Sequence, residues 1–324
     1  MGDGSHSTGG TQPTAMFICS AGHSGSTLLD LLLGSHPAAM SLGEITHLPK
    51  NVALNTSCTC GAPVHECAFW GRVLERLARE PAFGDWREDP YKLFLGFFEA
   101  SNVVDRRHQT MLRRILRKLV YVGAYLHWRS LPFYPFDAFT EPLRRGAANK
   151  RLLFRVIAEV AEKRLLIDSS KHYLEAVTLY RSAPADTRVL LLVRDGRAVF
   201  YSYLKRGYRR NRALEAWRGT YARGLPLLRE HVAQRDLIEV RYEDLVRDPR
   251  AELERVCAAV GTSFDARMLD FRARVHHVLN GNNMRFARDG TIRLDDEWRR
   301  KLSASDLRYF DSRAGALNRA LGYH

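Results

Sequence analysis

Short apolar runs alternate with helix-forming segments along most of the chain. Buried strands are predicted at residues 16–20, 165–168, 188–193 and 237–242, and a helical pattern follows each of them. This alternation is typical of an α/β protein with a central parallel sheet flanked by helices. Between about residues 68 and 163 the pattern is mostly helical. We therefore expect a helical insertion between the first two core strands.

The domain organisation is simple. Neither a repeat nor a low-complexity linker interrupts the pattern, so residues 15–324 are predicted to form a single domain after a polar tail at residues 1–14. Hydrophobic residues make up 45% of the chain and charged residues 27%, which excludes a disordered or collagen-like protein. Without a signal-like segment, a membrane-length apolar run or a dense set of cysteines, a cytoplasmic location is expected.

The charge balance adds a preference for anionic partners. The formal net charge is +14, yet no nucleic-acid-binding motif occurs, so a nucleic acid partner is not expected. Residues 110–120 place Arg113, Arg114, Arg117 and Lys118 opposite an apolar face. This pattern is typical either of peripheral contact with a membrane surface or of a packed helix with a solvated basic face.

A Gly/Ser loop directly after the first predicted strand has the composition of a phosphate-binding turn. Its glycines permit a tight turn, its hydroxyls donate hydrogen bonds, and the N-terminus of the next helix favours an anion. The spacing and the lysine of a Walker A motif are missing, and a Gly/Ser turn can also be purely structural. The residues expected to contact phosphate are Gly22, His23, Ser24, Gly25, Ser26 and Thr27.

A second candidate phosphate site follows the strand at residues 188–193. Arg194 ends this strand at the edge of the sheet where open α/β folds bind ligands, and Asp195 is placed to cap the next helix. Ser202 and Arg206 lie four residues apart on that helix and so share a face. The two arginines and the hydroxyl predict a phosphate site, the alternative being a capped helix with surface arginines.

Two phosphate sites on one sheet without a Walker lysine resemble the sulfotransferases that use 3′-phosphoadenosine 5′-phosphosulfate (PAPS). In that family an arginine and a serine eight residues apart hold the 3′-phosphate, as Arg194 and Ser202 are spaced here. The segments 241–249 (RYEDLVRDP) and 281–290 also resemble the family, the latter its bacterial members. The resemblance spans about residues 16–300. It implies a P-loop NTPase-like sulfotransferase fold and sulfuryl transfer from PAPS to an acceptor hydroxyl, with no metal required.

The resemblance also implies roles for individual residues. The loop at residues 22–27 would hold the 5′-phosphosulfate, and the acceptor would be a carbohydrate, a glycolipid or a small natural product. The residues implied to bind the rest of the donor are Arg194, Ser202 and Arg206 at the 3′-phosphate, Tyr242 at the adenosine, and Asn283, Arg285 and Phe286 in a covering loop.

His23 departs from the family pattern. Many members carry Lys or Arg immediately before the Ser-Gly of the first loop, where the cation neutralises the leaving group. His23 would act there as a cation or as a hydrogen-bond donor, and a cationic role would make activity sensitive to pH. Alternatively, the charge comes from Lys171, which follows the strand at residues 165–168.

Two residues are candidates for the catalytic base. Glu44 lies in a Gly-Glu pair that resembles the base position of protein-tyrosine and some bacterial sulfotransferases, whereas His172 resembles the histidine of cytosolic members. The sequence favours Glu44. In a water-poor cleft its carboxylate is expected to have a raised pKa, which would suit general base catalysis.

A cysteine-rich segment follows Glu44. Cys58, Cys60 and Cys67, with His65 between the last two, form a set of donors within ten residues. Three states are compatible with this spacing: a zinc site that includes His65, a local disulfide, or reduced structural thiols. Similar segments recur in bacterial members of the family.

Two other functions fit parts of the pattern. A P-loop-type small-molecule kinase would need ATP and Mg²⁺, but the Walker lysine and a clear set of Mg²⁺ ligands are missing. A non-catalytic module that binds a nucleotide or an anionic membrane would bind without turnover.

Overall fold

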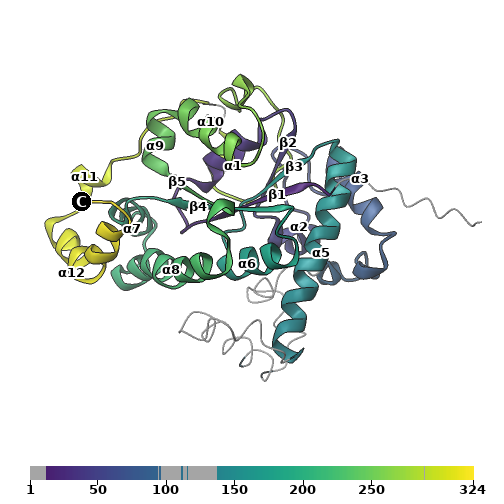
Figure 1. Ribbon diagram of the computed structural model, residues 1–324, viewed down its shortest axis with the longest axis horizontal. Coiled ribbons are helices and arrows are strands. Elements are labelled where there is room, and N and C mark those ends of the chain that lie inside the picture. The colour runs from purple at the N-terminus through teal and green to yellow at the C-terminus, as the bar shows by residue number, and fades with distance from the viewer. Residues whose placement is uncertain (1–11, 94, 96–110, 112–114, 116–136, 288) are drawn as a thin grey trace, which may run out of the picture.

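The computed structural model describes residues 12–93, 95, 111, 115, 137–287 and 289–324. A five-stranded parallel sheet runs through its centre in the order β2-β3-β1-β4-β5 (Figure 1). This architecture confirms the predicted parallel α/β fold. The strands are β1 (Thr14–Cys19), β2 (Ala39–Gly43), β3 (Leu165–Asp168), β4 (Thr187–Val193) and β5 (Leu237–Arg241).

Helices cover both faces of the sheet. In β1, Met16 and Ile18 pack into the core beneath α1, whereas Phe17 and Cys19 face the core on the opposite side. Burial on both faces explains why the strands are continuously apolar instead of alternating. One layer contains α1 (Ser26–Gly34), α9 (Tyr242–Arg247) and α10 (Pro249–Ala259) (Figure 1). The other contains α3 (Ala68–Leu77), α5 (Asp137–Ala161), α6 (Tyr173–Ser182), α7 (Gly196–Leu204), α8 (Arg210–His231) and α12 (Ala304–Ala320).

The edge strand β2 is a difference from the predicted pattern. Its sequence, AMSLG, contains no β-branched or aromatic residue, so it lacks the usual composition of a strand. It is nevertheless buried along its whole length because it pairs with β3 and packs against α1. The helical segment predicted between the first two core strands therefore lies between β2 and β3.

The predicted insertion at residues 68–163 is described only in part. Helices α3 and α5 confirm its helical character at the two ends. Apart from Met111 and Ile115, the basic segment at residues 110–120 lies outside the described residues. Within the described ranges, no helix has the length and hydropathy that crossing a membrane requires. The described residues also form the short helices α2 (Leu48–Ala53) and α11 (Trp298–Lys301).

Candidate active site

The carboxyl ends of all five strands open into one cleft of about 580 Å³. Each strand is followed within a few residues by a side chain that lines this cleft. Since parallel strands end at the same edge of a sheet, segments far apart in sequence meet here. The residues that follow β1, β2, β3, β4 and β5 in this way are His23, Glu44, Lys171, Arg194 and Tyr242.

The loop after β1 turns sharply before α1 begins. Gly25 caps α1 with φ of 94°, and a Cβ atom there would come within 2.5 Å of the Tyr242 ring, so this position needs glycine. Ser26 and Thr27 in the first turn line the cleft. The backbone N–H groups of a first helical turn have no partner within the helix, so this turn offers donors and the positive end of the helix dipole to an anion.

His23 has an uncharged ring in the free protein. Burial lowers its pKa to about 4, and the nearby cations Arg206, Lys171 and Arg194 act in the same direction. At neutral pH the ring is therefore a hydrogen-bonding group and not a cation. Its backbone has φ of 63°, a left-handed conformation that is uncommon outside glycine and is often found at functional sites.

Glu44 and Lys171 form an ion pair at the wall of the cleft. Burial by itself would raise the pKa of Glu44, but the Lys171 ammonium, with smaller contributions from His47 and His172, brings the pKa below the ordinary value. The predicted rise in the pKa of Glu44 is therefore wrong, because the sequence did not reveal this partner. The carboxylate is ionised at neutral pH and is able to accept a proton.

A second charged network lies in the interior behind this pair. Lys150 of α5 donates hydrogen bonds to Asp168 at 2.9 Å and to Glu175 at 3.3 Å, and the Thr46 hydroxyl donates to Glu175 at 2.8 Å. Ser170 links the two loops, since its hydroxyl donates to Asp168 and accepts the Thr46 N–H at 3.1 Å. The network thus fixes the two loops that carry Glu44 and Lys171.

Arg194 lies at the other side of the cleft. Its guanidinium donates to the His23 carbonyl at 2.9 Å, pairs with the Asp295 carboxylate at 3.0 Å, and stacks 4.2 Å from the Tyr242 ring centre. The Nε–H of Arg194 is buried without a partner. Ser202 of α7 and Arg206, in the turn just after α7, also line the cleft, although the helix ends before the second residue of the predicted shared face.

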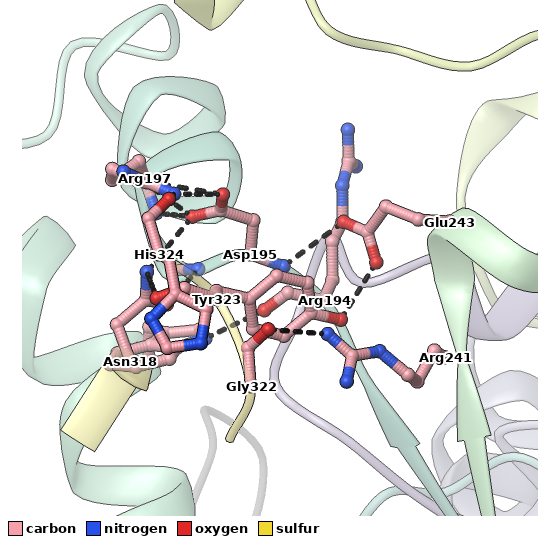
Figure 2. A network of polar contacts seen from close by, with 11 residues as sticks. Arg194, Asp195, Arg197, Arg241, Glu243, Asn318, Gly322, Tyr323 and His324 are labelled. Atoms are coloured by element: carbon pink, nitrogen blue, oxygen red, sulfur yellow. Dashed lines mark hydrogen bonds and ion pairs between the residues drawn. The ribbon is translucent and has the colours of Figure 1, made fainter. Parts of the chain in front are cut away.

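The turn that carries Arg194 is braced by residues near the C-terminus (Figure 2). The Asp195 N–H donates to Glu243 at 3.1 Å, and Glu243 in turn accepts a hydrogen bond from Tyr323 at 2.7 Å. Asn318 of α12 accepts the next backbone N–H, that of Gly196, at 2.8 Å. Helix α9, helix α12 and the C-terminal residues that follow it therefore hold the turn of Arg194 in place together.

A family model described as "Sulfotransferase family" matches residues 99–266, more than half of the chain. The chain belongs to the sulfotransferase family. The search of curated proteins finds no match.

Among solved structures, the sulfotransferase domain from the curacin biosynthetic pathway is 19% identical, with a TM-score of 0.50. The alignment covers 96% of this chain and 98% of that domain, and it supports a common fold. The sulfotransferase domain of the Synechococcus PCC 7002 olefin synthase is 22% identical over 94% of this chain and 96% of that domain, with a TM-score of 0.48.

The segment at residues 281–284 forms a further wall of the cleft in this sulfotransferase. Gly281, Asn282 and Asn283 line it, and the Asn282 N–H donates to the Thr27 hydroxyl at 3.1 Å. Arg285 and Phe286, predicted to cover the donor, are not among the lining residues. Arg285 instead donates to the Gly281 carbonyl at 2.6 Å, and its guanidinium stacks on the exposed Phe286 ring.

Three further predicted positions need correction. The Ser24 side chain is fully buried with its hydroxyl 3.4 Å from that of Tyr221, so the hydroxyl does not face the cleft. His172, the rival base, precedes α6 and is not a lining residue. His65 is not beside the three cysteines, because its Nε2 contacts the Val52 carbonyl at 2.8 Å; the imidazole near the thiols belongs to His277.

Sequence reasoning also missed several residues of the sulfotransferase site. Lys205, the C-cap residue of α7, lines the cleft, and its spacing of three residues from Ser202 was the available signal. Asp295, the partner of Arg194, lies in an irregular segment that has no motif. Lys150 was missed because a lysine in a long amphipathic helix usually faces solvent.

Proposed function

We propose that this sulfotransferase moves a sulfuryl group from PAPS to an acceptor hydroxyl and releases 3′-phosphoadenosine 5′-phosphate. The observation that carries the proposal is the presence of two anion-binding groups in one cleft. One follows β1 and combines the first turn of α1 with Lys171; the other follows β4 and combines Arg194 with Ser202 and Arg206. A donor with phosphate groups at both ends fits this arrangement.

Glu44 is the proposed general base. Ionised at neutral pH, it would take the proton from the acceptor hydroxyl while the oxygen bonds to sulfur. The bond between sulfur and the bridging oxygen breaks, and its electron pair stays on the leaving phosphate. Lys171 would neutralise that charge, and the neutral His23 ring would contribute a hydrogen bond. PAPS supplies the activated sulfuryl group.

The nucleotide end would be held by the second group. Arg194 offers a buried, unpartnered Nε–H, and Ser202 and Arg206 add a hydroxyl and a charge to the lining of the cleft. Tyr242 would contact the adenosine, and Asn283 also lines the cleft. Arg285 and Phe286 would contact the nucleotide only after a movement of their segment.

The acceptor and the cellular setting complete the proposal. We propose a carbohydrate, a glycolipid or a small natural product as acceptor, a single catalytic domain at residues 15–324, and a cytoplasmic location in a bacterium. The basic segment at residues 110–120 supports peripheral contact with an anionic membrane through its charge. A screen of acceptors with PAPS labelled in the sulfuryl group would identify the substrate.

Ligand-induced thermal stabilisation tests the donor. At one hundred times its dissociation constant, 3′-phosphoadenosine 5′-phosphate should stabilise the protein by about 2.7 kcal/mol. ATP with Mg²⁺ should stabilise it less, and preferential stabilisation by ATP with Mg²⁺ would favour a kinase instead.

The variant Arg194→Ala locates the 3′-phosphate in the same assay. It should weaken the effect of 3′-phosphoadenosine 5′-phosphate far more than that of adenosine 5′-phosphosulfate, which lacks this phosphate. The exposed Arg247→Ala is the matched control and should change neither. Equal losses for the two nucleotides in Arg194→Ala would show that this arginine is assigned to the wrong phosphate.

A further inference from the structure

Four potential metal ligands lie together outside the cleft. The Sγ atoms of Cys58, Cys60 and Cys67 and a ring nitrogen of His277 are all within 4.8 Å of one another. The Cys60 and Cys67 sulfurs are 3.6 Å apart, and His277 Nδ1 is 3.3 Å from the Cys67 sulfur and 3.7 Å from that of Cys58. The proposed sulfuryl transfer uses none of these residues.

These separations match the edges of a tetrahedral zinc site. With Zn–S bonds of about 2.3 Å and a Zn–N bond of about 2.0–2.1 Å, the donors around a zinc ion lie roughly 3.5–3.8 Å apart. The three closest donor pairs, at 3.3, 3.6 and 3.7 Å, lie near that range. All three cysteines are free thiols in the structure, so none is committed to a disulfide.

We propose that Cys58, Cys60, Cys67 and His277 bind one structural zinc ion. Three thiolates and an imidazole are soft donors that favour zinc over magnesium or calcium. Because the protein supplies all four ligands of a tetrahedral site, no position remains for a reacting water, which is the pattern of a structural site. The metal would therefore stabilise the fold and take no part in the chemistry.

The surroundings of the donors suit this role. Cys67 is the buried N-cap of α3. The ring of His277 stacks on Phe69, with centroids 5.1 Å apart, and its carbonyl accepts the Trp70 indole N–H at 2.8 Å. Such contacts fix the orientation of a ligand.

The donors come from two segments that are already joined by hydrogen bonds. Thr59, between two of the cysteines, donates its backbone N–H to the Val278 carbonyl at 3.1 Å. Its hydroxyl donates to the His276 carbonyl at 2.5 Å and accepts the Val278 N–H at 2.9 Å. The fourth ligand, His277, thus lies between two residues that contact Thr59. A zinc ion bound to the cysteines and to His277 would link the two segments further.

Residues 276–278, which carry His277, come directly before the cleft wall at residues 281–284. Gly43, which precedes Glu44, packs closely on them, since a Cβ atom on Gly43 would lie 2.5 Å from the Val278 side chain. Asn282 bonds to Thr27 in the phosphate-binding turn. Zinc at His277 would therefore anchor this wall, a consequence that rests on the proposed function. Loss of the metal should weaken the binding of 3′-phosphoadenosine 5′-phosphate as well as lower the melting temperature.

Metal analysis of the purified full chain tests the site. Elemental mass spectrometry should find one zinc per chain, and reconstitution with cobalt(II) should give the intense visible bands of a tetrahedral thiolate site. His277→Ala should lose the metal, whereas His277→Cys should keep it by providing a fourth thiolate. The matched control His65→Ala alters the histidine that lies between Cys60 and Cys67 in sequence but contacts Val52, and it should retain full zinc content.

Several results would overturn the proposal. A folded wild-type protein that holds neither zinc nor cobalt would do so, as would a Cys60–Cys67 disulfide found by peptide mapping without reduction. Zinc lost from His65→Ala but kept in His277→Ala would show that the fourth ligand is wrong. Metal content is measured without nucleotide, so a zinc-loaded protein that ignores 3′-phosphoadenosine 5′-phosphate would contradict only the proposed function.

Discussion

Two lysine–carboxylate groups lie near the carboxyl ends of β2 and β3, and they differ in their contact with water. The side chains of Lys171 and Glu44 at the cleft are 20% and 22% exposed. In the interior network those of Lys150, Asp168 and Glu175 are 2%, 0% and 5% exposed. The same chemical groups therefore occupy two different environments, one partly hydrated and one buried.

This difference separates a structural role from a reactive one. Removing one partner from a buried ion pair leaves an uncompensated charge, so Lys150 cannot leave its carboxylates without a large cost in stability. The cleft pair is partly hydrated, and Lys171 is able to exchange Glu44 for an incoming anion at little cost. If Lys171 turns to the leaving phosphate, the pKa of Glu44 rises, which makes it a stronger base at the moment when a proton must be removed.

Glu44→Gln should have the largest effect and should act on catalysis alone. Loss of a general base lowers kcat by about 10²–10⁴-fold, while the isosteric amide leaves the packing intact. Steady-state rates with the acceptor found by the labelled-donor screen measure kcat, and a thermal melt measures stability. A variant that keeps full activity would remove Glu44 from the mechanism.

Lys150→Met should act on stability. It leaves Asp168 and Glu175 buried without their cation, so the free energy of unfolding should fall by about 3–5 kcal/mol. Lys171→Met is the matched control, since it breaks a partly exposed pair worth about 1 kcal/mol or less. Urea denaturation at neutral pH compares the two variants. Equal losses would mean that burial does not distinguish the two groups.

The smallest expected effect is a change in pH dependence. In the wild type Lys171 holds the pKa of Glu44 below its ordinary value, so the base stays ionised as the pH falls. In Lys171→Met the strongest opposition to burial is lost and only the weaker effects of His47 and His172 remain against it, so that pKa should rise and the acidic limb of kcat/KM should move to higher pH. Lys205→Met removes a cation that pairs with Glu297 and should leave the limb in place. An unchanged limb in Lys171→Met would show that another group is the base.

The sequence predicted the cleft residues well where they come directly after a strand. His23, Arg194 and Tyr242 follow continuous apolar runs, and the parallel arrangement alone brings them to one edge. The sequence did not predict strand β2, because pairing and burial, and not composition, make it a strand. Its position explains why Glu44 reaches the cleft.

Contacts between segments that are distant in sequence could not be predicted from the pattern of residues. His65 is close to the cysteines in sequence, yet His277 is close in space because the segment that carries it pairs with Thr59. The lowered pKa of Glu44 was missed for the same reason, since its partner Lys171 is 127 positions away. Spacing along the chain predicts neighbours on one element but not partners across the fold.

The spacing of the parallel strands also limits the length of a ligand that spans the cleft. Neighbouring strands lie about 4.7–4.9 Å apart, so the three steps from β3 to β5 set roughly 14 Å between the loop of Lys171 and that of Tyr242. Backbone hydrogen bonds fix this span, and no side-chain substitution at the cleft changes it. Mutations are thus free to alter which acceptor is chosen, while the length of donor that fits stays constant.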